Sequence, residues 1–141
     1  MNEAETGVVE QTVRIAARPQ TVWRYWTEPD RMRDWWAAEA DVDPRPGGIC
    51  WVDLADGGTI RGEYVELVPY ERIVFTFGWE ESRVTDEIPP GSTLVEVTFV
   101  EEGGDTVMTL RHSGLPRTVI ELHHAGWGHH LPMLVAAVKE S

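Results

Sequence analysis

Four of the five histidines in the chain fall within the segment ELHHAGWGHHLPML, residues 121–134, around Trp127, one of seven tryptophans in the chain. Imidazole nitrogens bind zinc and transfer protons near neutral pH. The segment could therefore be a metal site, a catalytic centre, or one face of a packed helix. Which of these it can be depends on how the histidines are spaced around the element that carries them.

The spacing disfavours a metal site on this segment. The apolar periodicity predicts a helix from Thr118 to Lys139. On a helix, His123 and His130 are nearly eclipsed but about 10 Å apart along the axis, and no two of the histidines stand at the i, i+4 spacing that lets one helix hold one ion. Glu121 and His124 form an i, i+3 pair, but zinc takes three or four ligands. We therefore expect no metal ion and no cofactor.

The same periodicity predicts which side of this helix faces the core. Its apolar stripe comprises His123, Trp127, Leu131, Leu134 and Val138. His130 lies at the edge of the stripe, and His124 and His129 are expected to meet solvent. Pro132 has no N–H and would leave the Gly128 carbonyl without its partner, which predicts a kink or a later helix start.

Length and composition predict one globular domain, with residues 1–7 as a flexible tail and residues 8–141 as the domain. The chain has 24 acidic and 12 basic residues and a formal charge of -12. Nucleic acid or an anionic membrane would be repelled, so neither is expected as a partner. A single cysteine, Cys50, allows no intramolecular disulfide, and no segment resembles a signal peptide or a membrane span. We expect a cytoplasmic protein.

The order of elements predicts an α+β fold. An alternating strand at Val8 to Ala17 precedes two short helices, one beginning near Pro19 and one carrying Met32, Trp35 and Trp36. Strands joined by turns follow: ICWVDL, TIRGEYVELV, RIVFTFGWEE, STLVEVTFV and DTVMTLRHS. An antiparallel sheet of six to seven strands has one face to cover, and the long C-terminal helix is available to cover it. A strongly curved sheet around this helix can leave a gap for a ligand.

Side chains that face this gap are the candidate ligand-binding residues. Strand alternation and the helical stripe select Phe75, Phe77, Trp79, Val97, Phe99, Met108, Leu110, His112, His123, Trp127 and Leu131. Trp36 and Trp51 are added because wide, flat side chains suit a cavity wall, although the phase of the strand ICWVDL is ambiguous. His112 continues an apolar strand face. It is either a strand-end histidine bonded to backbone or water, or a polar group that orients a ligand, and burial would lower its pKa. The sequence has no nucleophile elbow, phosphate-binding loop, Rossmann pattern or CxxC motif, so no catalytic residue is assigned.

Several segments in this order resemble one known family. They are TVWRYWTEPDRMRDWW, PGG, GEYVELVPYERIVFTF, STLVEVTFV, TLRHSGL and HHAGWGHHLPML. Together, from Val8 to Val138, they resemble the activator of heat-shock-protein-90 ATPase homologue-like family of the START-related, birch-pollen-allergen-like superfamily. The resemblance implies a helix-grip fold, a curved antiparallel sheet around a long C-terminal helix with an internal, often hydrophobic cavity. It also implies an H-x-x-GW element at residues 123–127 and an H-S-G turn at residues 112–114, whereas Pro132, His129 and His130 depart from the family pattern.

Three functional hypotheses follow. The leading one is a non-enzymatic protein that binds an apolar or aromatic small molecule between sheet and helix, with a role in stress or resistance as an extension. The second is a protein-interaction module of the chaperone-activator type, with the acidic surface as the contact. The third is a cyclase- or hydrolase-like enzyme with His112 or His123 as general acid–base. A homodimer and a chaperone partner stay open.

Overall fold

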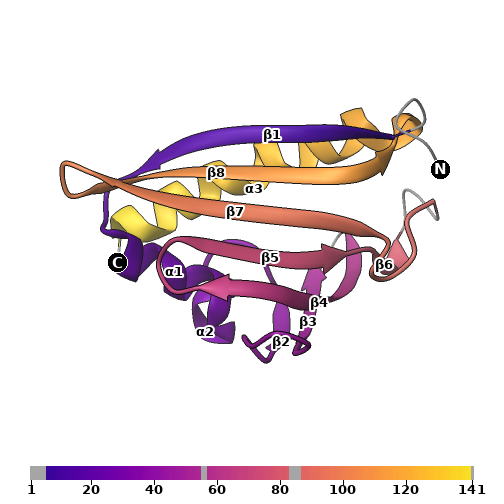
Figure 1. Cartoon of the computed structure of the whole chain (residues 1–141), viewed down its shortest axis with the longest axis horizontal. Coiled ribbons are helices and arrows are strands. Elements are labelled where there is room, and N and C mark those ends of the chain that lie inside the picture. Colours follow the sequence, from indigo (N-terminus) through magenta and orange to yellow (C-terminus); the bar gives the residue numbers. More distant parts are fainter. Residues whose placement is uncertain (1–5, 55–56, 83–86, 141) are drawn as a thin grey trace.

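The predicted α+β helix-grip fold is confirmed. In a computed structural model, which describes residues 6–54, 57–82 and 87–140, an antiparallel sheet curves around one long helix (Figure 1). The elements are β1 (Thr6–Ile15), α1 (Pro19–Thr27), α2 (Pro29–Met32), β2 (Glu39–Val42), β3 (Ile49–Leu54), β4 (Gly58–Val68), β5 (Arg72–Phe77), β6 (Trp79–Ser82), β7 (Thr93–Glu102), β8 (Asp105–Pro116), a 3-10 turn (Arg117–Val119) and α3 (Ile120–Glu140).

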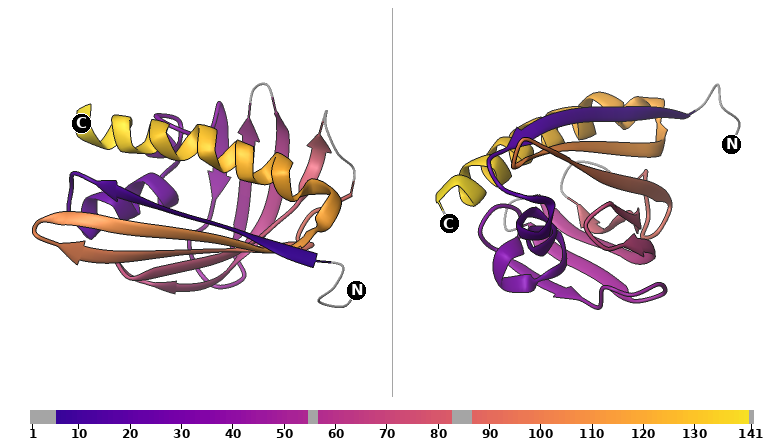
Figure 2. Two further views of the ribbon diagram at one scale, coloured as in Figure 1. Left: turned by 90° about the horizontal axis from the view of Figure 1, so that it is seen from above. Right: turned by 60° about the vertical axis from the view of Figure 1, so that its left-hand side comes forward.

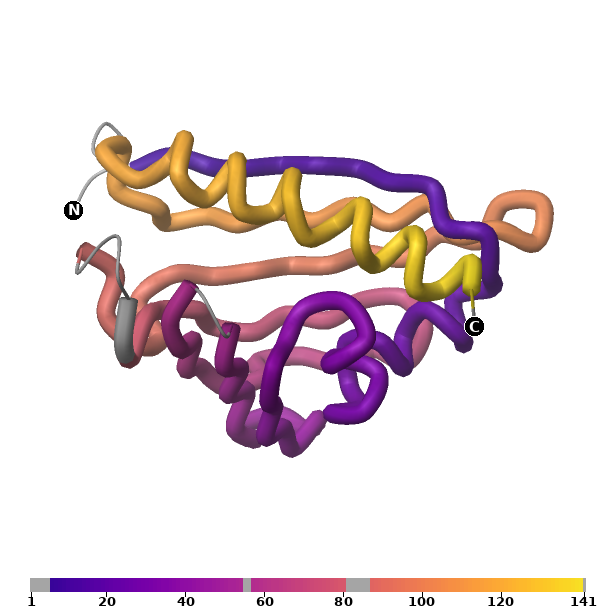
Figure 3. Tube along the Cα trace, turned by 180° about the vertical axis from the view of Figure 1, so that it is seen from behind, coloured from indigo at the N-terminus to yellow at the C-terminus, as the bar shows by residue number. Residues whose placement is uncertain are grey.

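The sheet has the strand order β1-β8-β7-β5-β4-β3-β2, and β6 pairs with β4 outside this order. Helix α3 covers one face of the sheet, and α1 and α2 lie near the C-terminal end of α3 (Figure 2). Seen from behind, α3 crosses in front of β1, β8 and β7, and the β2–β4 side of the sheet lies apart from it (Figure 3). The arrangement leaves α3 as the element that closes the concave face. Among the described residues, no helix is long and apolar enough to cross a membrane.

The sheet has more strands than the six to seven expected. Strand β2 is only four residues long, and the segment RIVFTFGWEE divides at Gly78 into β5 and β6. A Cβ atom at Gly78 would lie 1.8 Å from the Pro89 carbonyl oxygen, so only glycine permits this approach of two backbones. Beyond Gly78 the chain leaves its pairing with β7, and Trp79 pairs with Ile60 of β4 instead.

The first strand begins earlier than the sequence indicated. Strand β1 starts at Thr6 and so includes the last two residues of the tail expected over residues 1–7; residues 1–5 lie outside the described residues. The predicted alternation along the strands is confirmed by burial. The buried inward set comprises Ile73, Phe75, Phe77, Val95, Val97, Phe99, Met108, Leu110 and His112.

The second short helix ends earlier than expected. It stops at Met32, and Trp35 and Trp36 lie in the turn that follows. Both side chains are nevertheless buried: Trp35 Nε1 donates a hydrogen bond to the Tyr25 carbonyl at 2.8 Å, and the two indole rings stack at 5.2 Å. Packing of these rings against α1 therefore replaces the helical turn that the sequence pattern indicated.

Helix α3 buries the predicted stripe, which confirms the periodicity. Its buried residues are His123, Trp127, Leu131, Leu134 and Val138. Pro132 was expected to cause a kink or a later helix start, and the second alternative is wrong, because α3 begins at Ile120 and continues through Pro132 to Glu140. Both Pro132 and Gly128 are exposed, so water can solvate the carbonyl that Pro132 leaves without an N–H partner.

The position of Pro132 predicts a stabilising substitution. Pro132→Ala supplies an N–H donor for the Gly128 carbonyl and replaces proline by a good helix former. The free energy of unfolding, measured by urea denaturation, should therefore rise by about 1–3 kcal/mol. Pro29→Ala is the matched control, because Pro29 occupies the first turn of α2, where proline breaks no helical hydrogen bond. A loss of stability in Pro132→Ala, or an equal gain in both variants, would contradict this account.

Candidate functional site

His112 lies on β8 at the centre of the site, with no exposed surface. Trp127 Nε1 on α3 donates a hydrogen bond to His112 Nδ1 at 3.1 Å. An indole N–H can only donate, so Nδ1 must accept and the imidazole proton must be on Nε2. His112 Nε2 lies 2.8 Å from the Thr93 hydroxyl, which itself donates to the Phe77 carbonyl at 2.6 Å. Both nitrogens of His112 are therefore satisfied in one tautomer.

A second tryptophan–histidine pair lies beside the first. Trp79 Nε1 donates to His123 Nε2 at 3.1 Å, and His123 Nδ1 lies 2.7 Å from the Val119 carbonyl. The same reasoning places the proton of His123 on Nδ1, the opposite tautomer to that of His112. The two imidazole rings meet edge to face, with centroids 5.5 Å apart. The pairs thus form one buried polar cluster between α3 and the sheet.

This environment keeps both imidazoles neutral. Burial, and secondarily the charge that His123 would carry, lowers the pKa of His112 to about 3. Burial also lowers the pKa of His123, against the opposing effect of its hydrogen bond to the Val119 carbonyl. In each case, protonation would also remove the acceptor that a tryptophan N–H requires. The cluster is consequently a structural anchor whose nitrogens are already engaged.

Aromatic rings surround this anchor. The centroid of the Phe77 ring lies 4.5 Å from that of His112 and 6.1 Å from that of Trp127. The ring centroids of Trp36 and Trp127 are 5.4 Å apart. Edge-to-face and tilted contacts of this kind hold large rings in fixed orientations. The wall of the site is therefore rigid and apolar, although two imidazoles are built into it.

An inner pocket of about 150 Å³ opens next to this wall, between α3 and the sheet. Its lining comprises Trp36, Leu54, Gly57, Ile60, Phe77, Trp79, Leu122, His123, Gly126, Trp127 and His130. A Cβ atom at Gly126 would meet nothing within 4 Å, so this glycine leaves open space beside the pocket. The inner pocket is thus an apolar, partly open pocket bounded by aromatic and aliphatic side chains and, at Gly126, by the backbone of α3.

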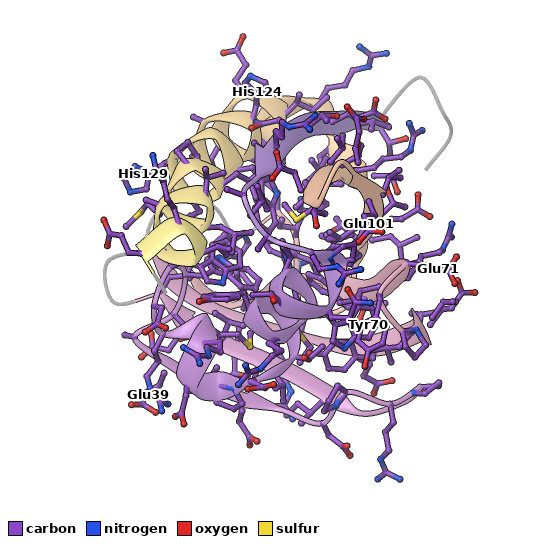
Figure 4. The ribbon with its side chains drawn as sticks, turned by 90° about the vertical axis from the view of Figure 1, so that its left-hand side faces the viewer. Glu39, Tyr70, Glu71, Glu101, His124 and His129 are labelled. Atoms are coloured by element: carbon purple, nitrogen blue, oxygen red, sulfur yellow. The ribbon has the colours of Figure 1, made fainter. Side chains whose placement is uncertain are left out.

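An outer pocket of about 520 Å³ adjoins the inner one. The two linings share Trp36, Leu54, Gly57 and His130. The outer lining adds the turn after α2 and the exposed side of α3, with Arg33, Asp34, Trp35, Ala37, Ala38, His129 and Met133. Figure 4 shows His124 and His129 pointing away from the sheet, which agrees with their predicted exposure. The outer pocket was not predicted, because its walls come from a turn and a helix flank without a shared sequence period.

The predicted ligand-binding residues divide into two groups, with Trp51 apart from both. Five line the inner pocket: Trp36, Phe77, Trp79, His123 and Trp127. Seven lie in the close-packed core, outside the lining of both pockets: Phe75, Val97, Phe99, Met108, Leu110, His112 and Leu131. Trp51 lies on the opposite face of β3 from the buried Cys50, Val52 and Leu54. Alternation identifies the inward face of a strand, but helices already fill most of that face here.

The arrangement offers no assembled metal-binding group in the part of the chain that the structure describes, where no three His, Cys, Asp or Glu side chains gather to hold an ion. His112 and His123 already use both ring nitrogens, as shown above. Of the histidines that line the inner pocket, His130 is the one with an unpaired nitrogen: its Nδ1 is buried and has no hydrogen-bond partner among the described residues.

Comparison with known proteins identifies the family. The model of the family described as "Activator of Hsp90 ATPase homolog 1-like protein" matches residues 16–139. The chain belongs to this family. Its membership accounts for the helix-grip architecture, in which a curved antiparallel sheet holds a C-terminal helix.

Individual relatives of this AHSA1-like domain support the assignment. An AHSA1-like protein from Rhizobium etli is 39% identical, with a TM-score of 0.73 over 95% of this chain and 83% of that one. The human "Activator of 90 kDa heat shock protein ATPase homolog 1" is 24% identical over 112 residues, which are 77% of this chain and 30% of the human protein. The chain therefore spans less than a third of that relative's length. The Aha1 dimer from Colwellia psychrerythraea shares the fold, with 16% identity and a TM-score of 0.77 over 94% of this chain and 96% of that one.

Two motifs of the AHSA1-like domain meet at the site. His123, Gly126 and Trp127 of the H-x-x-GW element all line the inner pocket, and Trp127 bonds to His112 of the H-S-G segment. The resemblance implied a turn at H-S-G, but these residues lie within β8. There, Gly114 has a φ of 76° beside an irregularity in the pairing of β1 with β8.

The buried imidazole of His112 predicts a pH-dependent stability. Above pH 6.5 both the folded and the unfolded states are neutral, whereas between about pH 6.5 and about 3 only the unfolded state binds the proton, so stability falls as the pH falls. Between pH 7 and 5 His112 should account for a loss of about 2 kcal/mol in the free energy of unfolding. Urea denaturation of wild type and His112→Gln measures this loss, which should be smaller in the variant by that amount.

His124→Gln is the matched control, because His124 is exposed; it should retain the wild-type pH dependence. If His112→Gln loses as much stability as wild type between pH 7 and 5, the proposed neutral state of His112 is wrong. Should His112→Gln fail to fold, the imidazole resonances of His112 in the wild-type protein provide the same test, since they should not titrate above pH 4.

Proposed function

We propose that this AHSA1-like domain binds a small apolar or aromatic molecule in the inner pocket between α3 and the sheet. The observation that supports the proposal is an apolar pocket of about 150 Å³ lined largely by aromatic and aliphatic side chains. An apolar pocket of this size has room for about one benzene-like ring, and an apolar lining favours such a ring over water. The stacked and tilted tryptophans suit a flat ligand better than a flexible chain.

The engaged state of the two histidines favours binding over catalysis. A general acid or base must reach the substrate with a free nitrogen or an exchangeable proton. At His123, which lines the pocket, Trp79 occupies one nitrogen and the Val119 carbonyl the other. At His112 the corresponding partners are Trp127 and Thr93. The cyclase- or hydrolase-like alternative therefore receives no support from these two groups.

A chaperone-activator role is the second candidate, and the name of the human relative is the observation that favours it. The acidic surface expected from a charge of -12 would provide the contact. This chain matches only 30% of the human protein, so the activity of the whole relative does not carry over by similarity alone. A homodimer, a role in stress or resistance and a cytoplasmic location remain predictions.

Ligand binding is testable by thermal shift with single-ring probes such as toluene and indole. At a free ligand concentration ten times the Kd, the free energy of unfolding should rise by about 1.4 kcal/mol, or roughly 4 °C in Tm, and should increase further with concentration. Gly126→Leu should abolish this response, because its side chain enters the open space beside the pocket.

The control for this experiment is Ala125→Leu, which adds a similar side chain on the exposed flank of the same helix. It should retain the wild-type response. A wild-type protein that shows no shift with either probe, or two variants that respond equally, would contradict binding in the inner pocket.

A further inference from the structure

His130 differs from the other buried histidines of the site. It is half-buried on α3 and lines both pockets, and its Nδ1 has no hydrogen-bond partner among the described residues. His112 and His123 each satisfy both nitrogens within the protein. Buried polar atoms in folded proteins are nearly always paired, so an unpaired one beside a pocket points to a partner supplied by a ligand.

The two pockets meet at this residue. Trp36 and Leu54 also contribute to both linings, so the inner pocket and the outer pocket are adjacent at His130. The inner pocket is apolar and has room for about one aromatic ring. The outer pocket, of about 520 Å³, is bordered by the charged residues Arg33 and Asp34. A molecule that occupies the inner pocket and reaches into the outer one therefore passes the side chain of His130.

The chemistry of the lining selects the polar group that would bind there. A hydroxyl both donates and accepts, so it matches either tautomer of a neutral His130. A carboxylate needs a cation, but Arg33 already pairs with Asp30 and, at 3.7 Å, with Glu39. Burial and the neighbouring His129 lower the pKa of His130, which keeps the imidazole neutral. The overall charge of -12 also opposes an anionic ligand.

We infer that the ligand is a neutral, phenol-like molecule whose ring occupies the inner pocket and whose hydroxyl hydrogen-bonds to the imidazole of His130, with any larger substituent in the outer pocket. This inference rests on the proposed binding function and specifies its ligand class. His130 acts as the specificity-determining residue that distinguishes a hydroxylated ring from a bare one.

The test compares three probes of similar size by isothermal titration calorimetry: p-cresol, toluene and 4-methylbenzoate. Wild type should bind p-cresol roughly 2- to 10-fold more tightly than toluene, as expected for one added hydrogen bond, and 4-methylbenzoate most weakly. His130→Phe keeps a planar ring but removes the nitrogen, so toluene should then bind more tightly than p-cresol. His124→Phe alters an exposed histidine of the same helix that lines neither pocket, and it should keep the wild-type order.

The outcomes separate the inference from the binding function. If toluene binds wild type as tightly as p-cresol, or if His130→Phe keeps the preference for p-cresol, the role of His130 is overturned and the binding function stands. Tightest binding of 4-methylbenzoate would overturn a neutral ligand. If none of the probes binds, both proposals fail. Should His130→Phe not fold, the ¹⁵N shifts of the His130 imidazole in wild type decide: they should move with p-cresol and stay unchanged with toluene.

Discussion

The hydrogen bond from the Trp127 indole to His112 Nδ1 joins α3 to strand β8 of the sheet, and the rest of the site depends on it. From His112 the chain of polar contacts continues to the Thr93 hydroxyl and then to the Phe77 carbonyl. It therefore passes from the helix through β8, β7 and β5, which are neighbours in the sheet. A buried imidazole is costly when unpaired, and here every donor and acceptor along the path has a partner.

This anchor determines where the sheet and the helix can separate. At Trp127 the helix is held close to the sheet, and the Trp79–His123 pair holds it again nearer its first turn. Between these pairs and the curved side of the sheet that contains β3 and β4, the side chains do not fill the space, and the inner pocket remains. A rigid polar anchor beside an apolar chamber is an arrangement suited to recognising a ligand by shape.

The sequence predicted the faces of the elements better than the contacts between them. Strand alternation correctly assigned Phe77 and His112 to the core, and the helical period assigned Trp127 and Leu131. It could not predict that Leu131 packs solidly while Trp127 borders a pocket, because that depends on which elements close over each residue. The phase of Trp51 was ambiguous, and it lies on the outer face of β3.

The tryptophan–histidine pairs could not be predicted from local sequence patterns, since Trp79 and His123 are 44 positions apart and meet only through tertiary packing. Long-range ¹H–¹⁵N spectra of the imidazole rings test this central feature most directly. At pH 7, His112 should be neutral with its proton on Nε2, and His123 neutral with its proton on Nδ1. A protonated ring at either position, or His112 in the Nδ1–H tautomer, would contradict the account.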